Sequence, residues 1–238
     1  ESVKKKISKN TKAIIHNHFC GYPGYIDEIN EIGRHCGIPV IDDGIEAFGS
    51  IYKGKMVGNW GADITIFSFN AVRIPNTIDG GAVVIRDKGM IKKAEMVRDG
   101  GIDRSVFRDE LGEIRPECDI TLTGHSATMS NVNAYIGIQQ MNCMENILKR
   151  QRRQAGIWIK ELECENDIQV ITRNEITPHY WVFGTLVRDK RKTIINFRNK
   201  GWYASGVHIN NNVYSIFGKK DELPGVNEFY AHYVALPC

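Results

Sequence analysis

The sequence lacks an apolar run near the roughly 18 residues that a membrane-spanning helix needs, and no signal-peptide pattern opens it. It also lacks an excess of charge of either sign, because 31 basic and 28 acidic side chains are mixed along its 238 residues. This balance argues against an obligate nucleic-acid or membrane partner. The densest basic run, residues 149–153, is expected to be the solvated face of a helix.

The chain has no Cys-x-x-Cys pair, no internal repeat and no low-complexity segment. Scattered cysteines in a chain of this size indicate reduced thiols and a cytoplasmic location rather than disulfides or a metal site. We therefore expect no metal. A hydrophobic content of 42% suffices for one large domain or two modest ones. The six cysteines are Cys20, Cys36, Cys118, Cys143, Cys164 and Cys238.

The first 43 residues predict a strand, a helix and a second strand. Residues 13–18 form an apolar strand pattern, and residues 25–35 carry Ile26, Ile29 and Ile32 at helical spacing. Gly37 is placed to end this helix, and a strand at 40–41 runs into two aspartates. Such a βαβ unit predicts a parallel sheet with a right-handed crossover. The expected fold class is α/β.

The rest of the chain predicts a second, smaller unit. We expect a short hairpin at 51–57, followed by strands at 63–69 and 80–85. The apolar run 63–69 predicts a strand that is buried on both faces. Helices are expected at 88–98, 130–141 with Ser130 as N-cap, and 144–163. Strands at 168–171, 180–187 and 206–209 and a helix at 189–200 follow. We place the domain boundary near residue 150, between a large domain (1–150) and a small one (151–238). Both are expected to be incomplete, because the chain opens on an exposed charged helix and stops without a closing helix.

Residues 38–81 place an acid, a hydroxyl and a basic side chain in a set order. Asp43 ends one strand, Ser68 ends another, and Arg73 follows five positions later, before the Gly80-Gly81 pair that opens a third strand. Pyridoxal-phosphate enzymes present a ring-binding acid, a phosphate-binding hydroxyl and a Schiff-base lysine in this order. Arginine cannot form that Schiff base. The segment therefore predicts a pyridoxal-phosphate site in which the amine is replaced.

Each of these residues also has a structural interpretation. Asp43 suits a helix or turn cap, Ser68 an ordinary buried hydroxyl, and Arg73 an ion pair with a carboxylate such as Asp79. Glu46, three residues after Asp43, is expected either to contact the cofactor ring or to be solvated.

Three further places in the sequence carry polar side chains suited to ligands. Residues 124–127 offer backbone N–H groups and the Ser126 hydroxyl to an anion. His18 suits a cofactor contact, although a histidine beside a strand is more often structural. His208 and Asn210, in a polar tract with two more asparagines, suit sugar hydroxyls or an ordinary turn.

Taken together, these phrases resemble the DegT/DnrJ/EryC1/StrS family of pyridoxal-phosphate-dependent nucleotide-sugar aminotransferases, over essentially the whole chain. The matching phrases are HNHFCGYPGYIDEI, IPVIDDGIEAFGSIYKGKMVGNWGADITIFSF, IDGGAVV, RDGGIDR and GHSATMSNVNAYIGIQQM. The resemblance implies the fold-type-I architecture, with a mixed, mostly parallel sheet and a small C-terminal domain. It also implies a homodimer with shared active sites, a nucleotide-linked keto-sugar substrate, glutamate as amino donor, and a role in surface-polysaccharide or amino-sugar biosynthesis.

By the same resemblance, Asp43 pairs with the pyridinium nitrogen and Ser68 binds the cofactor phosphate. Glu46 stands where the family usually has Gln beside the ring. Ser126 replaces an Asn that reaches the phosphate of the neighbouring subunit's cofactor. Arg73 occupies the Schiff-base lysine position.

Arg73 leaves three interpretations open. The chain is a sugar aminotransferase in a truncated or lysine-substituted form, or a non-catalytic homologue that binds a sugar nucleotide or a protein. The third is a dehydratase that uses pyridoxamine phosphate, since sugar 3-dehydratases of this family carry His at this position. The pKa of arginine lies above about 12, so an arginine side chain stays protonated near neutral pH. It is therefore a much poorer general base there than histidine.

Overall fold

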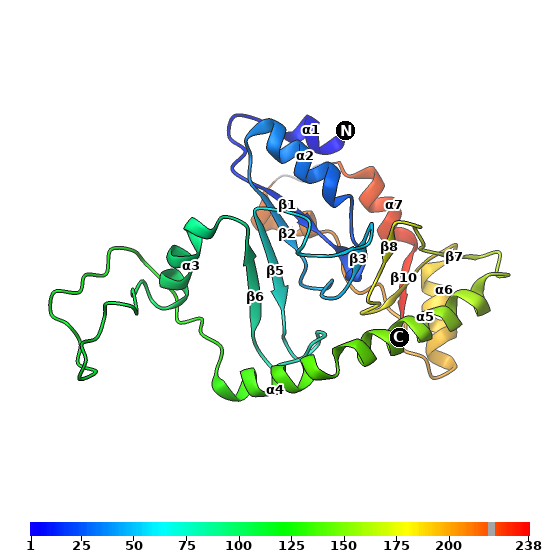
Figure 1. The fold of residues 1–238 in the computed structure, drawn as a ribbon. Helices are drawn as coiled ribbons and strands as arrows, with labels where there is room; N and C mark the ends of the chain where they lie inside the picture. The colour runs from blue at the N-terminus through cyan, green and yellow to red at the C-terminus, as the bar shows by residue number, and fades with distance from the viewer. Residues whose placement is uncertain (219–221) are drawn as a thin grey trace. The chain divides into compact units, whose positions relative to one another are not determined.

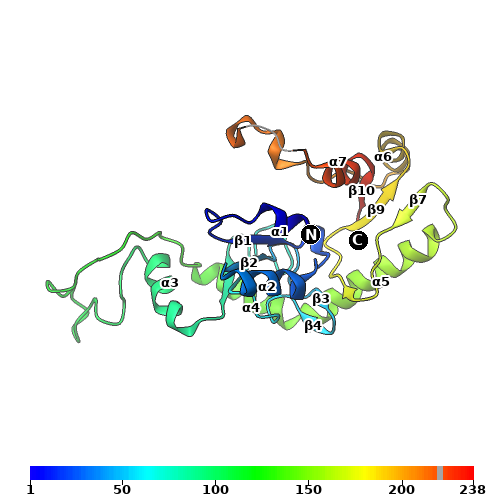
Figure 2. The ribbon, with the colours of Figure 1, turned by 90° about the horizontal axis from the view of Figure 1, so that it is seen from above.

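The computed structural model describes residues 1–218 and 222–238, drawn as a ribbon in Figures 1 and 2. These residues form two compact units. The first unit consists of residues 1–17, 24–45 and 58–142, and the second of residues 18–23, 46–57 and 143–238. The two-domain division predicted at residue 150 stays a prediction.

The first unit is built on a four-stranded sheet in the order β1-β2-β5-β6. The β1–β2 and β2–β5 pairs are parallel and the β5–β6 pair is antiparallel, so the sheet is mixed and mostly parallel, as predicted. Helix α2 (Ile26–Cys36) connects β1 to β2 and completes the expected βαβ unit. The strands are β1 (Ile14–Asn17), β2 (Val40–Asp43), β5 (Ile64–Ser68) and β6 (Gly81–Ile85).

Helices α1 (Ser2–Lys6) and α2 cover one face of this sheet. Their apolar residues pack against Ile14 and Val40, which are paired in register on that face. Helix α2 lies close to β2, because a Cβ added at Gly33 would overlap the Val40 side chain. The helix ends at Gly37, whose φ of 65° is the left-handed conformation that glycine adopts without strain.

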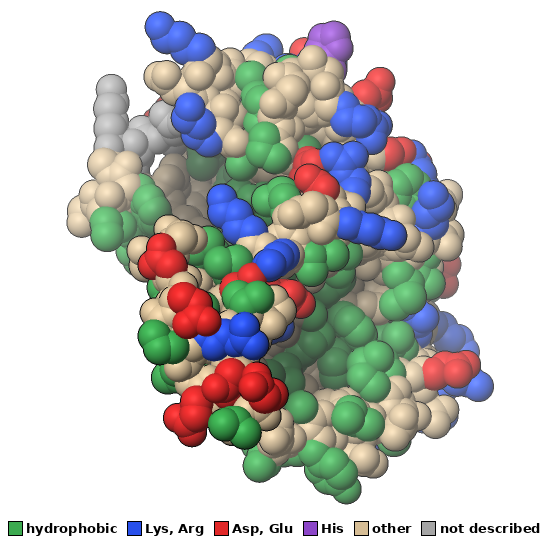
Figure 3. Space-filling view, turned by 60° about the vertical axis from the view of Figure 1, so that its left-hand side comes forward, with side chains coloured by type: hydrophobic (Ala, Val, Ile, Leu, Met, Phe, Trp, Pro, Cys, Tyr) green, Lys and Arg blue, Asp and Glu red, His purple; other side chains and the backbone are tan. Residues whose placement is uncertain are grey.

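The opposite face of the same sheet is open. Ile15 and Val83 are 71% and 58% exposed, and Ile66 in the middle of β5 is 38% exposed. The prediction that the strand at 63–69 is buried on both faces is therefore wrong for the described residues. Figure 3 shows a face of the molecule on which apolar side chains gather among charged ones.

The remainder of the first unit follows β6. A short 3-10 turn, η2 (Lys88–Met90), leads into α3 (Ile91–Arg98), and α4 (Asn131–Asn142) follows a long irregular segment. Ser130 caps α4 as predicted, because its Oγ accepts a hydrogen bond from the Asn133 N–H at 3.1 Å.

Among the described residues, the second unit contains two small antiparallel sheets and three helices. Its core lies beneath the sheet β10-β9-β7, where Phe183, Val234 and Leu236 are buried. The predicted hairpin is present as β3–β4 and pairs with β8. The strands are β3 (Ile51–Tyr52), β4 (Lys55–Met56), β7 (Ile168–Val170), β8 (Ile176–Thr177), β9 (Phe183–Val187) and β10 (Tyr233–Leu236). The helices are α5 (Met144–Leu162), α6 (Lys190–Asn199) and α7 (Pro224–His232), with 3-10 turns η1 (Phe19–Gly21), η3 (Asn211–Val213) and η4 (Ser215–Phe217).

Two expectations for the second unit are corrected, and one strand is added. Residues 206–209 form no strand, and only Ser205 makes a bridge there, to Ala235. The end of the described chain is a buried strand, β10, which the sequence analysis did not predict. Arg152, within the basic run 149–153, is half-buried and donates to the carbonyl oxygens of Gly49 and Pro178. Its burial lowers the pKa of the guanidinium.

Among residues 1–218 and 222–238, no helix combines the length and the hydropathy that crossing a membrane requires.

Candidate functional site

Three polar residues stand at the carboxyl edge of the sheet in the first unit. Asn17, Asp43 and Ser68 are the last residues of β1, β2 and β5. Asn17 pairs in register with Asp43, which pairs with Ile66, two residues before Ser68. Because strand side chains alternate between faces, all three lie on the open face of the sheet, opposite α2. Ligands of open α/β sheets bind outside the carboxyl ends of the strands.

Hydrogen bonds fix the orientation of the Asp43 carboxylate. Its Oδ2 accepts from the Asn17 side-chain amide at 2.9 Å, and its Oδ1 accepts from the Ile45 N–H at 3.2 Å. Both donors are neutral, so the negative charge is not offset by these contacts. A half-buried carboxylate held in this way is suited to accept a hydrogen bond from a protonated ring nitrogen. The Ile45 contact is also the turn-capping role that the sequence allowed.

Ser68 stands where β5 meets β6. It pairs with Gly81, and a Cβ on Gly81 would lie 2.6 Å from the Phe67 carbonyl oxygen, so only glycine fits there. The Ser68 Oγ accepts from the Asn70 N–H at 3.3 Å. A hydroxyl that accepts from the backbone still has its own O–H to donate, for example to a phosphate oxygen. Phe67 is buried on the covered face, because neighbouring strand residues point to opposite faces.

Arg73 lies in a closed loop that follows β5. The loop is tied at its base by hydrogen bonds from the Phe69 N–H to the Gly80 carbonyl and from the Thr77 N–H to the Phe69 carbonyl, both 2.8 Å long. The Arg73 N–H donates to the Asn70 carbonyl within the loop at 2.8 Å. Arg73 is half-buried, and a guanidinium is a hydrogen-bond donor rather than a nucleophile.

The segment around Ser126 is exposed and is paired with the end of α3. The N–H groups of His125 and Ala127 donate to the carbonyls of Val97 and Arg98 at 2.6 and 3.0 Å. These two N–H groups are therefore not available to an anion, which corrects that part of the prediction. The Ser126 side chain is exposed, and its contact with a cofactor phosphate stays a prediction.

The backbone partner of Ser126 is Asp99, which is held by two arginines. Its carboxylate accepts from the Nε groups of Arg98 and Arg104 at 2.8 and 2.5 Å. These two hydrogen bonds lower the pKa of Asp99 to about 2, and the one from Arg98 has the larger effect on the pKa. The two arginines therefore tie residues 98–104 together through one carboxylate, and the backbone of the same aspartate bridges to Ser126.

Glu46 belongs to the second unit, where its buried carboxylate has two partners. Oε2 accepts from the Cys20 N–H at 2.7 Å, and Oε1 lies 3.1 Å from the His208 Nε2. The His208 ring is held by Phe19, edge-on at 5.6 Å between centroids, and by Trp181, stacked at 6.3 Å. The sequence analysis did not find Cys20, because it stands far from Glu46 and His208 along the chain.

The remaining predicted residues also lie in the second unit. His18 is fully buried at the start of η1. Asn210 donates from its side-chain amide to the Asn227 Oδ1 at 2.7 Å. The structure thus groups Asp43 with Ser68 in one unit and Glu46 with His208 in the other. The ligand roles of His18, His208 and Asn210 stay predictions.

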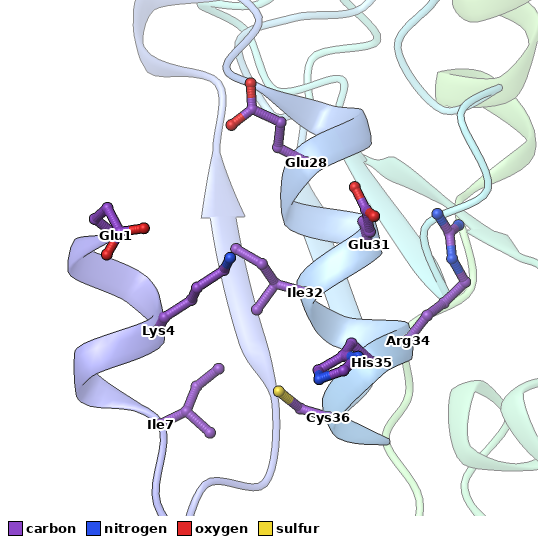
Figure 4. A pocket seen from close by; sticks show the side chains of 9 residues that line it. All are labelled: Glu1, Lys4, Ile7, Glu28, Glu31, Ile32, Arg34, His35 and Cys36. Atoms are coloured by element: carbon purple, nitrogen blue, oxygen red, sulfur yellow. The ribbon is translucent and has the colours of Figure 1, made fainter.

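A separate groove of about 890 Å³ lies in the first unit between α1 and α2 (Figure 4). Lys4, Glu31 and His35 are among the side chains that line it. None of the predicted ligand-binding residues lines this groove.

The comparisons with known proteins agree on one family. The family model of the DegT/DnrJ/EryC1/StrS aminotransferase family matches residues 1–238. The uncharacterized protein MJ1066 of Methanocaldococcus jannaschii is 30% identical over all of this chain and 64% of its own length. AtS13 from Actinomadura melliaura (28% identity) and the sugar aminotransferase CalS13 from Micromonospora echinospora (25%) both have a TM-score of 0.90. In each case 99% of this chain and 64% of the relative are covered.

The chain therefore spans just under two thirds of the length of these relatives. Their likeness confirms the fold-type-I architecture. Aminotransferases of this family use pyridoxal phosphate, and Spr1654 from Streptococcus pneumoniae, which has the same fold at 18–19% identity, was solved in a pyridoxal and a pyridoxamine phosphate form.

Proposed function

We propose that this chain, which belongs to the DegT/DnrJ/EryC1/StrS aminotransferase family, binds pyridoxal or pyridoxamine phosphate as part of a sugar aminotransferase. The observation that carries the proposal is the placement of Asn17, Asp43 and Ser68 as the last residues of three neighbouring strands, on one open face. A pyridine ring that carries a phosphate requires an acid to accept its ring N–H and a hydroxyl to donate to the phosphate, and this edge of the sheet offers both.

The residues present fit the cofactor except at one position. Asp43, oriented by Asn17, would accept the ring N–H, and the Ser68 hydroxyl would donate to the phosphate. When bound, the cofactor supplies an electron sink for the carbon that carries the amino group. Asp43 keeps the ring nitrogen protonated, which maintains that electron sink.

Arg73 does not fit the role of the lysine. A guanidinium neither attaches covalently to the cofactor aldehyde nor releases a proton near neutral pH. We expect it to bind an anionic group by charge instead, so that this chain holds its cofactor without a covalent bond.

The test is a titration with pyridoxal phosphate of the chain and of its Arg73→Lys variant, followed by borohydride reduction and mass spectrometry. We expect reversible binding to the parent and a reduced covalent adduct only in the variant. Arg188→Lys, at an exposed position in the second unit, is the matched control and should gain no adduct. If neither protein binds the cofactor while both are folded, the proposal is wrong for this chain.

Arg73 supports two further candidate functions. The first is a homologue that binds ligand without transamination, and the second is a dehydratase that uses pyridoxamine phosphate. Removal of a sugar hydroxyl without amino transfer, when pyridoxamine phosphate and a keto-sugar are supplied, would favour the dehydratase. Binding of a sugar nucleotide with no turnover in either the parent or the Arg73→Lys variant would favour the binding protein.

The finer features of the family resemblance are also proposals. They are a nucleotide-linked keto-sugar substrate, glutamate as amino donor, a homodimer with shared sites, a role in polysaccharide or amino-sugar biosynthesis, and a cytoplasmic location. His208 and Asn210 are the side chains that we assign to the sugar, and Glu46, Ser126 and His18 those that we assign to the cofactor surroundings.

A further inference from the structure

We propose that Cys20, Glu46 and His208 of the cofactor-free chain bind a divalent cation of the zinc type, a function beyond the cofactor binding proposed above and exclusive of the sugar and cofactor contacts assigned there to His208 and Glu46 while the ion is bound. Their potential ligand atoms (the Cys20 sulfur, a Glu46 carboxylate oxygen and a ring nitrogen of His208) all lie within 4.8 Å of one another. All three residues belong to the second unit. The site joins segments that are far apart in the sequence.

The distances are close to those that a tetrahedral ion needs. Zinc–nitrogen and zinc–oxygen bonds of about 2.0–2.1 Å at a tetrahedral angle place the two ligand atoms about 3.3 Å apart. The Glu46 Oε1 and the His208 Nε2 are 3.1 Å apart. A zinc–sulfur bond of about 2.3 Å calls for about 3.6 Å between the sulfur and either atom. Because the three ligand atoms lie within 4.8 Å of one another, the sulfur has to approach by at most about 1.2 Å.

The ligand types select the metal. A thiolate and an imidazole favour zinc, cobalt and ferrous iron, whereas magnesium and calcium prefer oxygen ligands alone. Three protein ligands leave a fourth position for water. As the metal–sulfur bond forms, the Cys20 thiol loses its proton to the buffer, and the neutral His208 donates its Nε2 lone pair.

The surroundings hold two of the ligands in place. The Cys20 N–H bond to Oε2 fixes the Glu46 carboxylate and turns Oε1 toward His208. Phe19 and Trp181 fix the plane of the His208 ring. Cys20 and Glu46 are buried, while 43% of the His208 side chain is exposed, so an ion would enter from the histidine side.

A purely structural role is the competing explanation. In that case Glu46 links Cys20 and His208 by hydrogen bonds alone, and the thiol packs among aromatic rings and interacts with Tyr233. The two explanations differ in one observable, which is whether the Cys20 sulfur becomes a metal-bound thiolate.

Cobalt titration of the cofactor-free full chain tests this directly. A thiolate bound to Co²⁺ gives a charge-transfer absorption in the near ultraviolet, and Zn²⁺ should bleach it at one equivalent per chain. We expect about one proton to be released per ion bound, measured with an indicator dye. Cys20→Ala and His208→Ala should each weaken binding more than about 100-fold, since losing even an outer-shell partner costs about 10–100-fold.

Cys36→Ala is the matched control, because Cys36 is exposed in the first unit beside His35. This variant should keep the absorption band and the affinity of the parent. His208→Ala alters a side chain that is 43% exposed, so it remains informative if Cys20→Ala fails to fold, as judged by near-ultraviolet circular dichroism. Absence of the band in the parent, or binding with the parent's affinity in either ligand variant, would overturn the proposal.

Discussion

The two main sheets of the molecule differ in how much of their apolar surface is covered. In the second unit, all four residues of β10 are buried, and Phe183 at the start of β9 has no exposed surface. In the first unit, one face of the sheet packs on α1 and α2, while Ile15, Ile66 and Val83 on the other face are exposed. Mostly parallel sheets are normally covered on both faces.

The difference indicates where each unit gets its stability. The second unit closes a core around β9 and β10 from its own residues, so its stability resides within it. The first unit exposes the face on which Asp43 and Ser68 stand, which leaves that face open to ligands and to other protein surfaces. The candidate cofactor residues therefore lie on the less protected of the two sheets.

The largest effect is expected from matched truncations of the two sheets. Phe183→Ala should destabilise the second unit by about 3–5 kcal/mol, because it removes a fully buried ring. Val83→Ala should change the stability of the first unit by about 0.5 kcal/mol or less, because the side chain is mostly exposed. Urea unfolding followed by peptide-resolved hydrogen exchange measures both.

A loss of more than about 2 kcal/mol for Val83→Ala would break the comparison. It would mean that this face is covered in solution. If the loss also grew with protein concentration, the cover would be a second copy of the chain.

The stability of the two units is also expected to depend on pH in different ranges, with the first unit sensitive to acid and the second to alkali. In the first unit, Arg98 and Arg104 lower the pKa of Asp99 to about 2 from an ordinary value of 3.8. A lowered folded-state pKa stabilises the fold above pH 3.8, and this contribution disappears as the pH falls towards 2. Protection of residues 97–127 should therefore fall between about pH 4 and pH 2. In Asp99→Asn it should already be lower at pH 7, with less dependence on acid.

The second unit should respond at the alkaline end instead. Burial raises the pKa of Cys238 to about 11 from 9.0, and burial also raises the pKa of Tyr22 and Tyr233. These groups stabilise the fold fully below their unfolded-state pKa values, and the contribution is lost as the pH rises through the folded-state values. Hydrogen exchange of residues 143–163, corrected for the intrinsic rate, measures this. Equal acid sensitivity of both units would contradict the assignment.

The sequence predicted what depends on local pattern and order. The βαβ unit, the Gly37 helix end, the Ser130 cap and the position of Asp43 and Ser68 at strand ends are set by spacing along short segments. Family phrases then supplied the fold type. Such features need no knowledge of distant contacts, because each rests on residues within one helix or strand.

What the sequence did not predict depends on contacts between distant residues. Glu46 lies 26 residues from Cys20 and 162 from His208, so no local pattern groups them. The exposure of Ile66 is set by the absence of a covering element among the described residues, which an apolar run cannot reveal. Residues 206–209 have a strand-like pattern, but among the described residues they pair with no strand, and the bridge beside them is made by Ser205. Pairing partners, not propensity, decide such segments.

Effects smaller than that of Phe183→Ala are expected from one substitution made in a helix of each unit. Gly156 is exposed in α5, and an added Cβ there meets nothing within 4 Å. Gly156→Ala should therefore stabilise the second unit by about 0.5–1 kcal/mol, since alanine restricts the unfolded chain and favours the helix. Thermal unfolding followed by circular dichroism at 222 nm, the usual helix wavelength, measures the shift.

Gly33→Ala is the counterpart in the first unit and should have the opposite sign. An added Cβ there would overlap the Val40 side chain and lie 2.8 Å from the Ile38 carbonyl oxygen, so α2 has to move away from β2. Overpacking of this kind costs about 1–3 kcal/mol. If Gly33→Ala were neutral, α2 would be free to shift on its sheet. The covered face of the first unit would then be as loosely held as its open face, and the contrast between the units would extend to both sides of the sheet.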